Sequence, residues 1–386
     1  MTATVRNLPK RKATVDFASA GPDTAGGKLL RRYWQPVRLS RDLAPGTMIP
    51  IHIMGERFTL YRGESGTAHV VGFRCAHRNT QLSPGWVRGD AVQCFYHGWT
   101  FDADGKCIAR PAEQPPGPCA HVSIPAYPTH EHMGLIYAYF GEGEAPPFPA
   151  FPVFDGDMVI ENIALEFPCN WFQTYENQVD EVHVAFVHSG SRSHVNLGRE
   201  QSLPNTIVNE TEYGFDRITW SGDNQKRLCV YPFPNHMRMR RVLGARDSYL
   251  TLVPTDDEHH ILFMTTKTNV PADDEAAVAA YRQTQADLAA QVAVLPSIAD
   301  VGQHVLDGKM TMEQVMAHPL RTFIEDVVAQ SGQGAIHDRT KEVLGRSDVG
   351  VARLRKVFER ELQAVERGEP GKVWNYSGDP APTPGY

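Results

Sequence analysis

The sequence has few cysteines and no hydrophobic run of membrane-spanning length. Six cysteines stand among 386 residues, far fewer than in the small secreted folds that disulfides hold together. The longest apolar stretch, near residues 134–140, is much shorter than the roughly 20 residues that a transmembrane helix needs. No apolar segment follows the charged N-terminus, so a secretory signal is not predicted. We therefore expect a cytoplasmic protein with reduced or metal-bound thiols and no membrane association.

An excess of positive charge is also missing. The chain carries 38 Lys and Arg against 45 Asp and Glu, which gives a formal net charge of −7 at pH 7. This mildly acidic balance argues against nucleic acid as the main partner, although it leaves room for local basic patches. Internal repeats, low-complexity tracts and coiled-coil heptads are absent from the sequence as well. Length then indicates about two globular domains.

Glycine and proline are abundant, with 32 and 28 residues, which indicates many turns and short strands. From about residue 48 to residue 140, segments of alternating polarity are separated by Gly-containing turns, a pattern typical of a small all-β unit. A Pro-rich run over 144–152 marks a boundary. Beyond it we expect strands at 162–167 and within 206–269, and helices at 170–188, 273–294, 321–330 and 348–367.

These patterns predict an α+β protein with a small all-β domain followed by a larger domain of strands and helices. The predicted division is 1–35 for an N-terminal arm and a short helix that packs on the larger domain, 36–148 for the β domain and 149–386 for the larger domain. Ser347 and Asp348 are candidates for the N-cap of the last helix.

Two loops of the β domain each carry one cysteine and one histidine. Cys75 and His77 form the first pair, and Cys94 and His97 follow after sixteen intervening residues. Two thiolates and two imidazoles can bind one tetrahedral metal or a two-iron cluster. Zinc fingers place cysteine with cysteine and histidine with histidine, whereas here each loop is mixed. The mixed arrangement favours a 2Fe-2S cluster in which both cysteines hold one iron and both histidines hold the other.

Residues 73–101 contain both pairs and resemble the cluster-binding segment of Rieske proteins, more narrowly that of the Rieske non-haem iron oxygenases. Respiratory Rieske proteins carry an extra disulfide pair in these loops and a Gly-Ser after the last ligand histidine. This chain has neither, since Gly98 and Trp99 follow His97. The resemblance implies that the two Cys-His pairs bind a Rieske 2Fe-2S cluster and that the chain is a terminal oxygenase α subunit.

A second group of metal-binding residue types lies at 176–188. Asp180 and His183 are three residues apart and share a helix face. His183 and His188 are five apart, which places them about 140° from each other on an ideal helix, so their convergence requires a local irregularity. Two histidines and one carboxylate make up the facial triad of non-haem Fe(II) oxygenases. From these residues alone, ordinary surface or core histidines remain an alternative.

The same segment resembles the oxygenase family's Asn-x-x-Asp-x-x-His-x4-His pattern, at Asn177, Asp180, His183 and His188. The resemblance implies that the two histidines bind a mononuclear Fe(II). It also implies that Asp180 is an electron-transfer bridge, which hydrogen-bonds an iron-ligand histidine to the cluster histidine, His97, of the neighbouring subunit. A plain helix-face carboxylate is the alternative for Asp180.

The third iron ligand is expected to be a carboxylate far downstream. Glu325 and Asp326 are adjacent candidates within the predicted helix 321–330. Family members place the ligand Asp second in such a pair, so Asp326 is the choice and Glu325 the fallback. Asp307 and Asp338 are less favoured because their neighbourhoods do not match.

The resemblance extends over most of the chain, from residue 29 to residue 367, and is greatest to the phthalate-dioxygenase-like branch, which includes aryl-ether O-demethylases. It implies a catalytic domain of the helix-grip type with an antiparallel sheet, and a homotrimer or stacked-trimer hexamer. It also implies a separate NAD(P)H-dependent flavin/iron-sulfur reductase, since the chain has no G-x-G-x-x-G dinucleotide fingerprint. The expected reaction uses O2 to hydroxylate an aromatic substrate, with an aromatic carboxylate favoured, by ring dihydroxylation or O-demethylation.

Substrate recognition and three rival functions stay open. In the strand pattern at 235–242, alternation places Arg238 and Arg240 on one face and Met237 and Met239 on the other. The arginines either bind a substrate carboxylate or lie on a solvated or reductase-docking face. The rivals are a Rieske monooxygenase that N-demethylates or hydroxylates a heterocyclic or alkylamine substrate, a Rieske-type electron carrier without catalysis, and a structural zinc protein.

Overall fold

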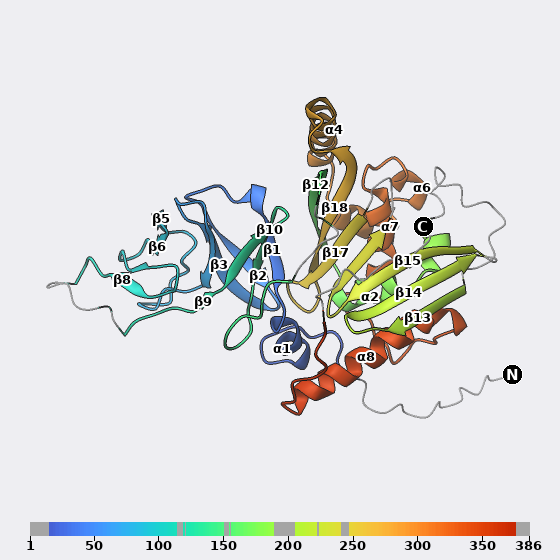
Figure 1. Ribbon diagram of the computed structural model, residues 1–386, viewed down its shortest axis with the longest axis horizontal. Helices are drawn as coiled ribbons and strands as arrows, with labels where there is room; N and C mark the ends of the chain where they lie inside the picture. The colour runs from blue at the N-terminus through green and yellow to red at the C-terminus, as the bar shows by residue number, and fades with distance from the viewer. Residues whose placement is uncertain are drawn as a thin grey trace.

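The computed structural model describes residues 15–113, 119, 121–149, 154, 156–188, 205–221, 224–240 and 247–375. Within them, four antiparallel sheets form the framework, with the N-terminal strands at one side of the molecule and the C-terminal sheet and helices at the other (Figure 1). The first fourteen residues of the predicted arm and residues 150–152 of the Pro-rich run lie outside the described residues. No helix in the described ranges is both long and apolar enough to span a bilayer.

The N-terminal part of the described chain contains three small sheets, with the strand orders β1-β11-β10, β2-β3-β4-β9 and β5-β6-β7-β8. Short strands between tight turns build them, as the alternating pattern predicts. Their strands are β1 (Gln35–Leu39), β2 (Met48–Ile53), β3 (Glu56–Arg62), β4 (Ala68–Gly72), β5 (Trp86–Arg88), β6 (Ala91–Gln93), β7 (Thr100–Phe101), β8 (Cys107–Ala109), β9 (Ala126–Tyr127), β10 (Thr129–His132) and β11 (Leu135–Ala138).

The C-terminal part is built on a seven-stranded sheet with the order β12-β18-β17-β16-β15-β14-β13. Its strands are β12 (Met158–Phe167), β13 (Asn205–Glu210), β14 (Gly214–Ser221), β15 (Asn224–Pro232), β16 (His236–Arg240), β17 (Asp247–Pro254) and β18 (His260–Pro271). All neighbouring strands of this sheet are antiparallel. Helices α2 (Trp171–Val179) and α8 (Val349–Glu366) pack against it. The predicted α+β class with a helix-grip catalytic part is therefore confirmed.

A tight hairpin links the N-terminal part to the large sheet. Met54 and Gly55 connect β2 to β3, and their φ angles are 51° and 73°, the geometry of a type I′ turn. Glycine adopts this conformation without strain, whereas Met54 does so at a cost. The backbone N–H groups of the two residues donate to the carbonyls of Pro254 and Thr255 at 2.7 Å. The turn is therefore fastened to the end of β17.

Helices fill the space around the large sheet. They are α1 (Ala25–Arg31), α2, α3 (His183–Phe186), α4 (Glu275–Ala293), α5 (Ile298–Leu306), α6 (Met312–Val315), α7 (Arg321–Ser331) and α8, with 3-10 turns at Ser40–Asp42 and Arg346–Asp348. Side-chain caps define several starts: Asn170, Asp274 and Ser297 each accept a hydrogen bond from a backbone N–H of the first turn of α2, α4 and α5.

Two details of the helices differ from the prediction. The single helix expected over 170–188 is wrong, because α2 ends at Val179 and α3 is a separate short turn. The expected cap of the last helix is confirmed in position, since Asp348 is the N-cap residue of α8, but the side-chain capping bond is missing. Asp348 precedes α8, but its carboxylate accepts a hydrogen bond from the backbone N–H of Gly345 at 2.6 Å and makes no capping bond to α8.

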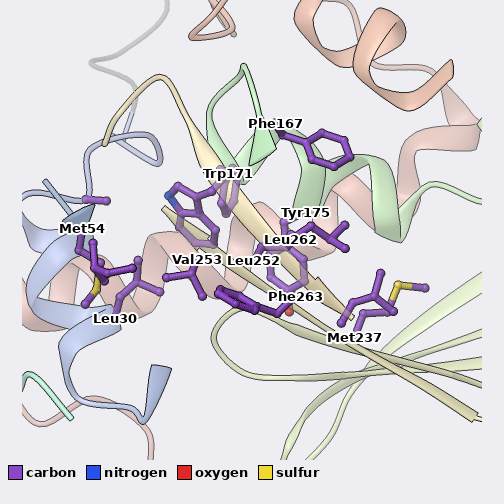
Figure 2. Packing of buried hydrophobic residues seen from close by; sticks show 14 of the residues in the cluster. Leu30, Met54, Phe167, Trp171, Tyr175, Met237, Leu252, Val253, Leu262 and Phe263 are labelled. Carbon is purple, nitrogen blue, oxygen red and sulfur yellow. The ribbon is translucent and has the colours of Figure 1, made fainter. Parts of the chain in front are cut away.

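Two hydrophobic clusters make up the core of the described residues. The larger one joins the N-terminal strands to α2, α8 and the large sheet. Figure 2 shows Leu30 and Met54 of the N-terminal part beside Trp171 of α2 and Val253 of β17. The smaller cluster lies under the two Cys-His loops and contains only residues between Met48 and Ala126. The division of the chain between residues 148 and 149 stays a prediction.

A buried ion network ties α2 to the chain around α8. Glu176 accepts hydrogen bonds from Arg339 Nε and Nη2 at 3.0 and 2.8 Å, and from Arg355 Nε at 2.6 Å. Arg355 also donates through Nη2 to Glu342 at 2.9 Å. The side chain of Glu176 is only 9 % exposed. Both guanidinium groups therefore share one largely buried carboxylate.

Replacing Glu176 with Ala is expected to lower the free energy of unfolding by about 3–5 kcal/mol, because breaking a buried ion pair leaves a desolvated charge behind. Urea denaturation followed by tryptophan fluorescence measures the change. Asp307→Ala is the control, since its pair with Lys309 lies at the surface and such pairs contribute little. Equal denaturation midpoints for the wild type and Glu176→Ala would contradict a stabilising role of the network.

Candidate metal centres and active site

The two Cys-His loops fold into the same type of turn. The first loop follows β4, and the second connects β6 to β7. In each loop the cysteine N–H donates to the carbonyl five residues ahead at 2.8 Å, and the residue four positions ahead donates to the cysteine carbonyl at 3.0 Å. The latter residues, Asn79 and Gly98, have φ angles of 56° and 73°. This left-handed conformation reverses the chain tightly, so each loop returns on itself around its cysteine.

The four residues predicted to bind a cluster line one cavity, and they are Cys75, His77, Cys94 and His97. The two histidine rings lie 4.7 Å apart, centroid to centroid. Cys75 and Cys94 are 1 % and 2 % exposed, whereas His77 is exposed and His97 is half-buried. Sulfur donors therefore lie on the inner side and imidazoles on the outer side. This separation suits a 2Fe-2S cluster with one Cys-bound and one His-bound iron.

Burial and the neighbouring thiol shape the chemistry of the first cysteine. Burial is the main factor that raises the pKa of Cys75 to about 11, and the proximity of Cys94 acts in the same direction. A thiol with such a pKa stays protonated at neutral pH until a metal displaces the proton.

Aromatic side chains hold the outer histidines. The ring of Trp99 stacks on His77 with a centroid distance of 4.6 Å and an interplanar angle of 1°. The ring of Tyr96 lies 3.8 Å from that of His97, and the Arg110 guanidinium lies over Trp99 at 5.4 Å. None of these three neighbours belongs to the two Cys-His pairs that the sequence predicts as ligands. Tyr96 and Trp99 stand within two residues of His97 in the sequence, which was the available signal for these two, whereas Arg110 is distant in the sequence and only the fold brings it near.

A second group of metal-binding side chains consists of His183, His188 and Asp326. One ligand atom from each lies within 4.8 Å of the others. Asp326 Oδ1 is 3.9 Å from His183 Nε2 and 3.4 Å from His188 Nε2. The histidines come from α3 and the turn after it, whereas Asp326 lies on α7. Two imidazoles and one carboxylate are the donor set of a mononuclear non-haem Fe(II) site.

The break between α2 and α3 allows the two histidines to meet. Residues 180–182 leave the helical path, and the Asp180 carboxylate accepts the backbone N–H of Val182 at 2.8 Å. The rings of His183 and His188 then lie 5.4 Å apart, centroid to centroid. The local irregularity that their five-residue spacing requires is therefore confirmed.

Each histidine is held through its Nδ1 atom. His183 Nδ1 donates to the backbone carbonyl of Asp180 at 2.5 Å, and His188 Nδ1 donates to Glu325 Oε2 at 2.8 Å. These bonds leave both Nε2 atoms available as metal ligands. Glu325 therefore stands behind His188, whereas Asp326 faces both rings. The geometry favours Asp326 over Glu325 as the third residue that could hold a metal.

The surroundings of the two histidines have opposite effects on their charge. Burial lowers the pKa of His183 below its ordinary value. Burial acts in the same direction on His188, but hydrogen bonds with Asp326 and Glu325 outweigh it and raise the pKa of His188 to about 9. Two carboxylates around one imidazole favour a positive charge at this place, which a divalent cation also supplies.

Asn177 and Asp180 complete the surroundings. Asn177 Nδ2 donates to Asp326 Oδ1 at 3.1 Å and lies 3.4 Å from His183 Nε2. Asn177 matches the first position of the motif in the sequence, but its contact with Asp326 is visible only in the structure. Asp180 contacts His183 through its backbone carbonyl. Its carboxylate is engaged by the backbone N–H of Val182.

Both interpretations of the arginine strand need correction for Arg238, whereas for Arg240 they stay untested. Met237 and Met239 face the core, as the alternation predicts. Arg238, however, is 3 % exposed and donates through Nε and Nη2 to Asp247 Oδ1 at 3.2 and 3.1 Å. It is therefore neither on a solvated face nor available as a substrate clamp in this arrangement. The side chain of Arg240 lies outside the described residues.

Comparisons with known proteins agree with this geometry. The family model of the Rieske 2Fe-2S domain matches residues 33–128. The 5,5'-dehydrodivanillate O-demethylase oxygenase subunit of Sphingobium sp. strain SYK-6 is 31 % identical over 92 % of this chain and 81 % of its own length. Phenoxybenzoate dioxygenase subunit alpha of Ectopseudomonas oleovorans is 28 % identical over 95 % and 86 %. The solved terminal oxygenase of carbazole 1,9a-dioxygenase from Novosphingobium sp. KA1, at 20 % identity, shares the fold with a TM-score of 0.63 over 92 % of this chain and 98 % of that one.

The chain belongs to the Rieske non-haem iron oxygenases, as an oxygenase subunit of the phthalate-dioxygenase-like and aryl O-demethylase branch. It is therefore an oxidoreductase that incorporates oxygen from O2, and its cofactors are a Rieske 2Fe-2S cluster and a mononuclear non-haem iron. It receives electrons from a separate electron-transfer partner. The rival interpretations as an electron carrier without catalysis and as a structural zinc protein are wrong, because the relatives that match nearly the whole chain are oxygenases.

Asp326→Ala is expected to lower the iron content from about three to about two per chain while the two sulfides of the cluster remain. The physical reason is the loss of one of three donors around the mononuclear iron. Colorimetric iron and acid-labile sulfide counts on anaerobically purified protein measure the change. Glu325→Gln is the matched control, since its amide oxygen can still accept the proton of His188 Nδ1, and we expect it to retain its iron. The reverse pattern would make Glu325 the ligand.

Proposed function

We propose that this protein is the terminal oxygenase component of a multicomponent system that hydroxylates an aromatic substrate. The reaction is ring dihydroxylation or O-demethylation, and an aromatic carboxylate is the favoured substrate. The observation that carries the proposal is the convergence of His183, His188 and Asp326 in a chain that also carries the two Cys-His loops. Two relatives support the substrate class, since their names describe an O-demethylase of dehydrodivanillate and a dioxygenase of phenoxybenzoate.

The proposal assigns seven side chains to metal binding. Cys75, His77, Cys94 and His97 hold the 2Fe-2S cluster, and His183, His188 and Asp326 hold the mononuclear iron. When bound, these groups supply single electrons and the activation of O2. The other residues orient the ligands: the Asp180 carbonyl and the Glu325 carboxylate fix the two imidazoles through Nδ1, and such partners raise the basicity of a ligating histidine.

We infer that the working site is completed between copies of the chain. Within one chain, the loops around β5 and β6 lie at one end of the molecule and α2 and α7 toward the other (Figure 1). Asp180 is the proposed bridge, whose carboxylate accepts a hydrogen bond from His97 of a neighbouring copy. A homotrimer or stacked-trimer hexamer in the cytoplasm, with an NAD(P)H-dependent flavin/iron-sulfur reductase as electron donor, belongs to the same proposal. So does the division into 1–35, 36–148 and 149–386.

A product screen tests the substrate class and the reaction together. The oxygenase is reconstituted with a reductase and offered aromatic carboxylates and methoxyarenes under 18O-labelled O2. We expect either a cis-diol that carries two labelled oxygens, or an unlabelled phenol together with formaldehyde that is released with one labelled oxygen. Mass spectrometry of the products reads the label. Turnover of methylated amines alone, with no aromatic carboxylate or methoxyarene consumed, would contradict the proposal.

Asp180→Asn is expected to retain both metal centres but to lower coupled product formation by about a hundredfold or more, because a displaced or missing contact in a reacting assembly costs that much. The variant keeps the backbone carbonyl that holds His183, so only the carboxylate charge is removed. Metal content and steady-state turnover with an efficient reductase are measured together. Asp273→Asn, an exposed carboxylate before α4, is the control. Near-normal turnover of Asp180→Asn would remove Asp180 from the proposed route.

A further inference from the structure

A buried arginine of the large sheet contacts the break between α2 and α3. Arg217 on β14 is 1 % exposed. Its Nη1 donates to the backbone carbonyl of Gln178 at 2.8 Å, and its Nη2 lies 2.5 Å from Glu181 Oε2. Nη2 also contacts Cys229 Sγ at 3.2 Å. One guanidinium group thus engages the last turn of α2 and the first residue after Asp180.

This contact takes up the carbonyl that a longer helix would use. Gln178 lies in the last turn of α2, where carbonyl groups lose their helical partners. The Tyr231 hydroxyl donates to the same carbonyl at 2.7 Å, so two side chains of the sheet, Arg217 and Tyr231, occupy it. A continuing helix would offer this carbonyl to the N–H of Val182, but that N–H donates to the Asp180 carboxylate instead. The Gln178 carbonyl is therefore bonded by side chains of the sheet instead of by the next turn of a helix.

The contact depends on the shape and charge of arginine. A guanidinium presents several donors in one plane and can bind a carbonyl and a carboxylate at once, whereas the ammonium of lysine acts as a point charge. The Glu181 side chain is 10 % exposed, so the pair is largely shielded from water. Burial opposes the charged form of Arg217, but the carboxylate of Glu181 beside it favours that form, and the pKa of Arg217 lies above its ordinary value. The cation persists in its buried place.

We propose that Arg217 is a positioning residue for the mononuclear iron site: it ends α2 and anchors the bend at 180–182, so that the Asp180 carbonyl meets His183 Nδ1. The inference rests on the function proposed above for this site. Asp326 is delivered by a different helix, α7, and its position does not depend on this bend. Loosening the bend therefore displaces His183 and leaves Asp326 in place.

Hydrogen exchange of the full-length protein tests this role without reference to turnover. In Arg217→Met, which replaces the cation by an apolar chain, amides within 178–188 are expected to exchange about tenfold faster or more, because the bend opens locally. Peptides of α7 and of the two Cys-His loops are expected to exchange as in the wild type. Mass spectrometry measures the exchange before and after a chelator has removed the mononuclear iron. Arg217→Lys is expected to restore part of the protection.

Fe(II) affinity gives a second readout. Loss of a group that orients a metal ligand typically weakens binding about ten- to a hundredfold, and we expect this for Arg217→Met in titrations of the chelated protein with Fe(II). Arg238→Met is the matched control, since it removes an equally buried arginine that is paired with Asp247. We expect it to lose stability without a change in exchange at 178–188 or in Fe(II) affinity.

The outcomes separate this inference from the proposed function. Unchanged exchange at 178–188 in folded Arg217→Met, or an equal effect of Arg238→Met, would overturn the role of Arg217 even if the wild type hydroxylates aromatic substrates. A wild type without hydroxylation would instead overturn the proposed function and leave the exchange result standing. Should Arg217→Met fail to fold, Glu181→Gln serves as the second variant, because it keeps the contact between Arg217 and the Gln178 carbonyl. We expect Glu181→Gln to accelerate exchange in the same segment. The absence of that change would contradict the inference.

Discussion

The mononuclear site depends on a helix that stops. A continuous helix holds residues five apart about 140° from each other, so His183 and His188 could not face one point along an unbroken α2. Because α2 ends at Val179, the chain turns once and α3 starts afresh at His183. The Asp180 carbonyl, freed from helical bonding, then accepts the His183 Nδ1 proton. His188 lies directly after this turn, and its Nδ1 atom donates a hydrogen bond to Glu325 of α7.

The second requirement is the register between α2 and α7. Thr174 hydrogen-bonds to Gln330 across the two helices, and about one turn further along, Asn177 donates to Asp326 at 3.1 Å. Residue numbers rise along α2 as they fall along α7, so these are successive hydrogen bonds between two antiparallel helices. A shifted register between the two helices would break both hydrogen bonds, and leaving these buried polar groups without partners would cost free energy. These contacts bring Asp326 to a segment 149 residues away in the sequence.

Features that lie within a short segment could be predicted from the sequence. Features that depend on contacts between distant segments required the tertiary structure. Each Cys-His pair lies within one loop, so its residues could be grouped without knowledge of the fold. The break in 170–188 could not be located, because that segment contains no glycine or proline. Its cause lies in Arg217 and Tyr231, on strands that come later in the chain. In the sequence, Glu325 likewise could not be distinguished from a metal ligand, whereas in the structure it forms a hydrogen bond with His188.

The two metal centres also differ in how they meet solvent. Cys75 and Cys94 are buried, so the first centre presents its histidine edge, with His77 exposed, at the molecular surface. The side chains of His183 and Asp326 are only 13 % and 12 % exposed, so the second centre is recessed. An outward edge at one end of a chain and a recessed centre toward its other end suit a head-to-tail contact between copies. Such contacts use two different surfaces of each subunit, and they form a closed ring when the rotation between subunits allows closure. In the proposed trimer, every copy presents the histidine edge of its first centre to one neighbour, and its recessed second centre receives the histidine edge of the other neighbour. A trimer is the smallest ring in which these two neighbours are different subunits.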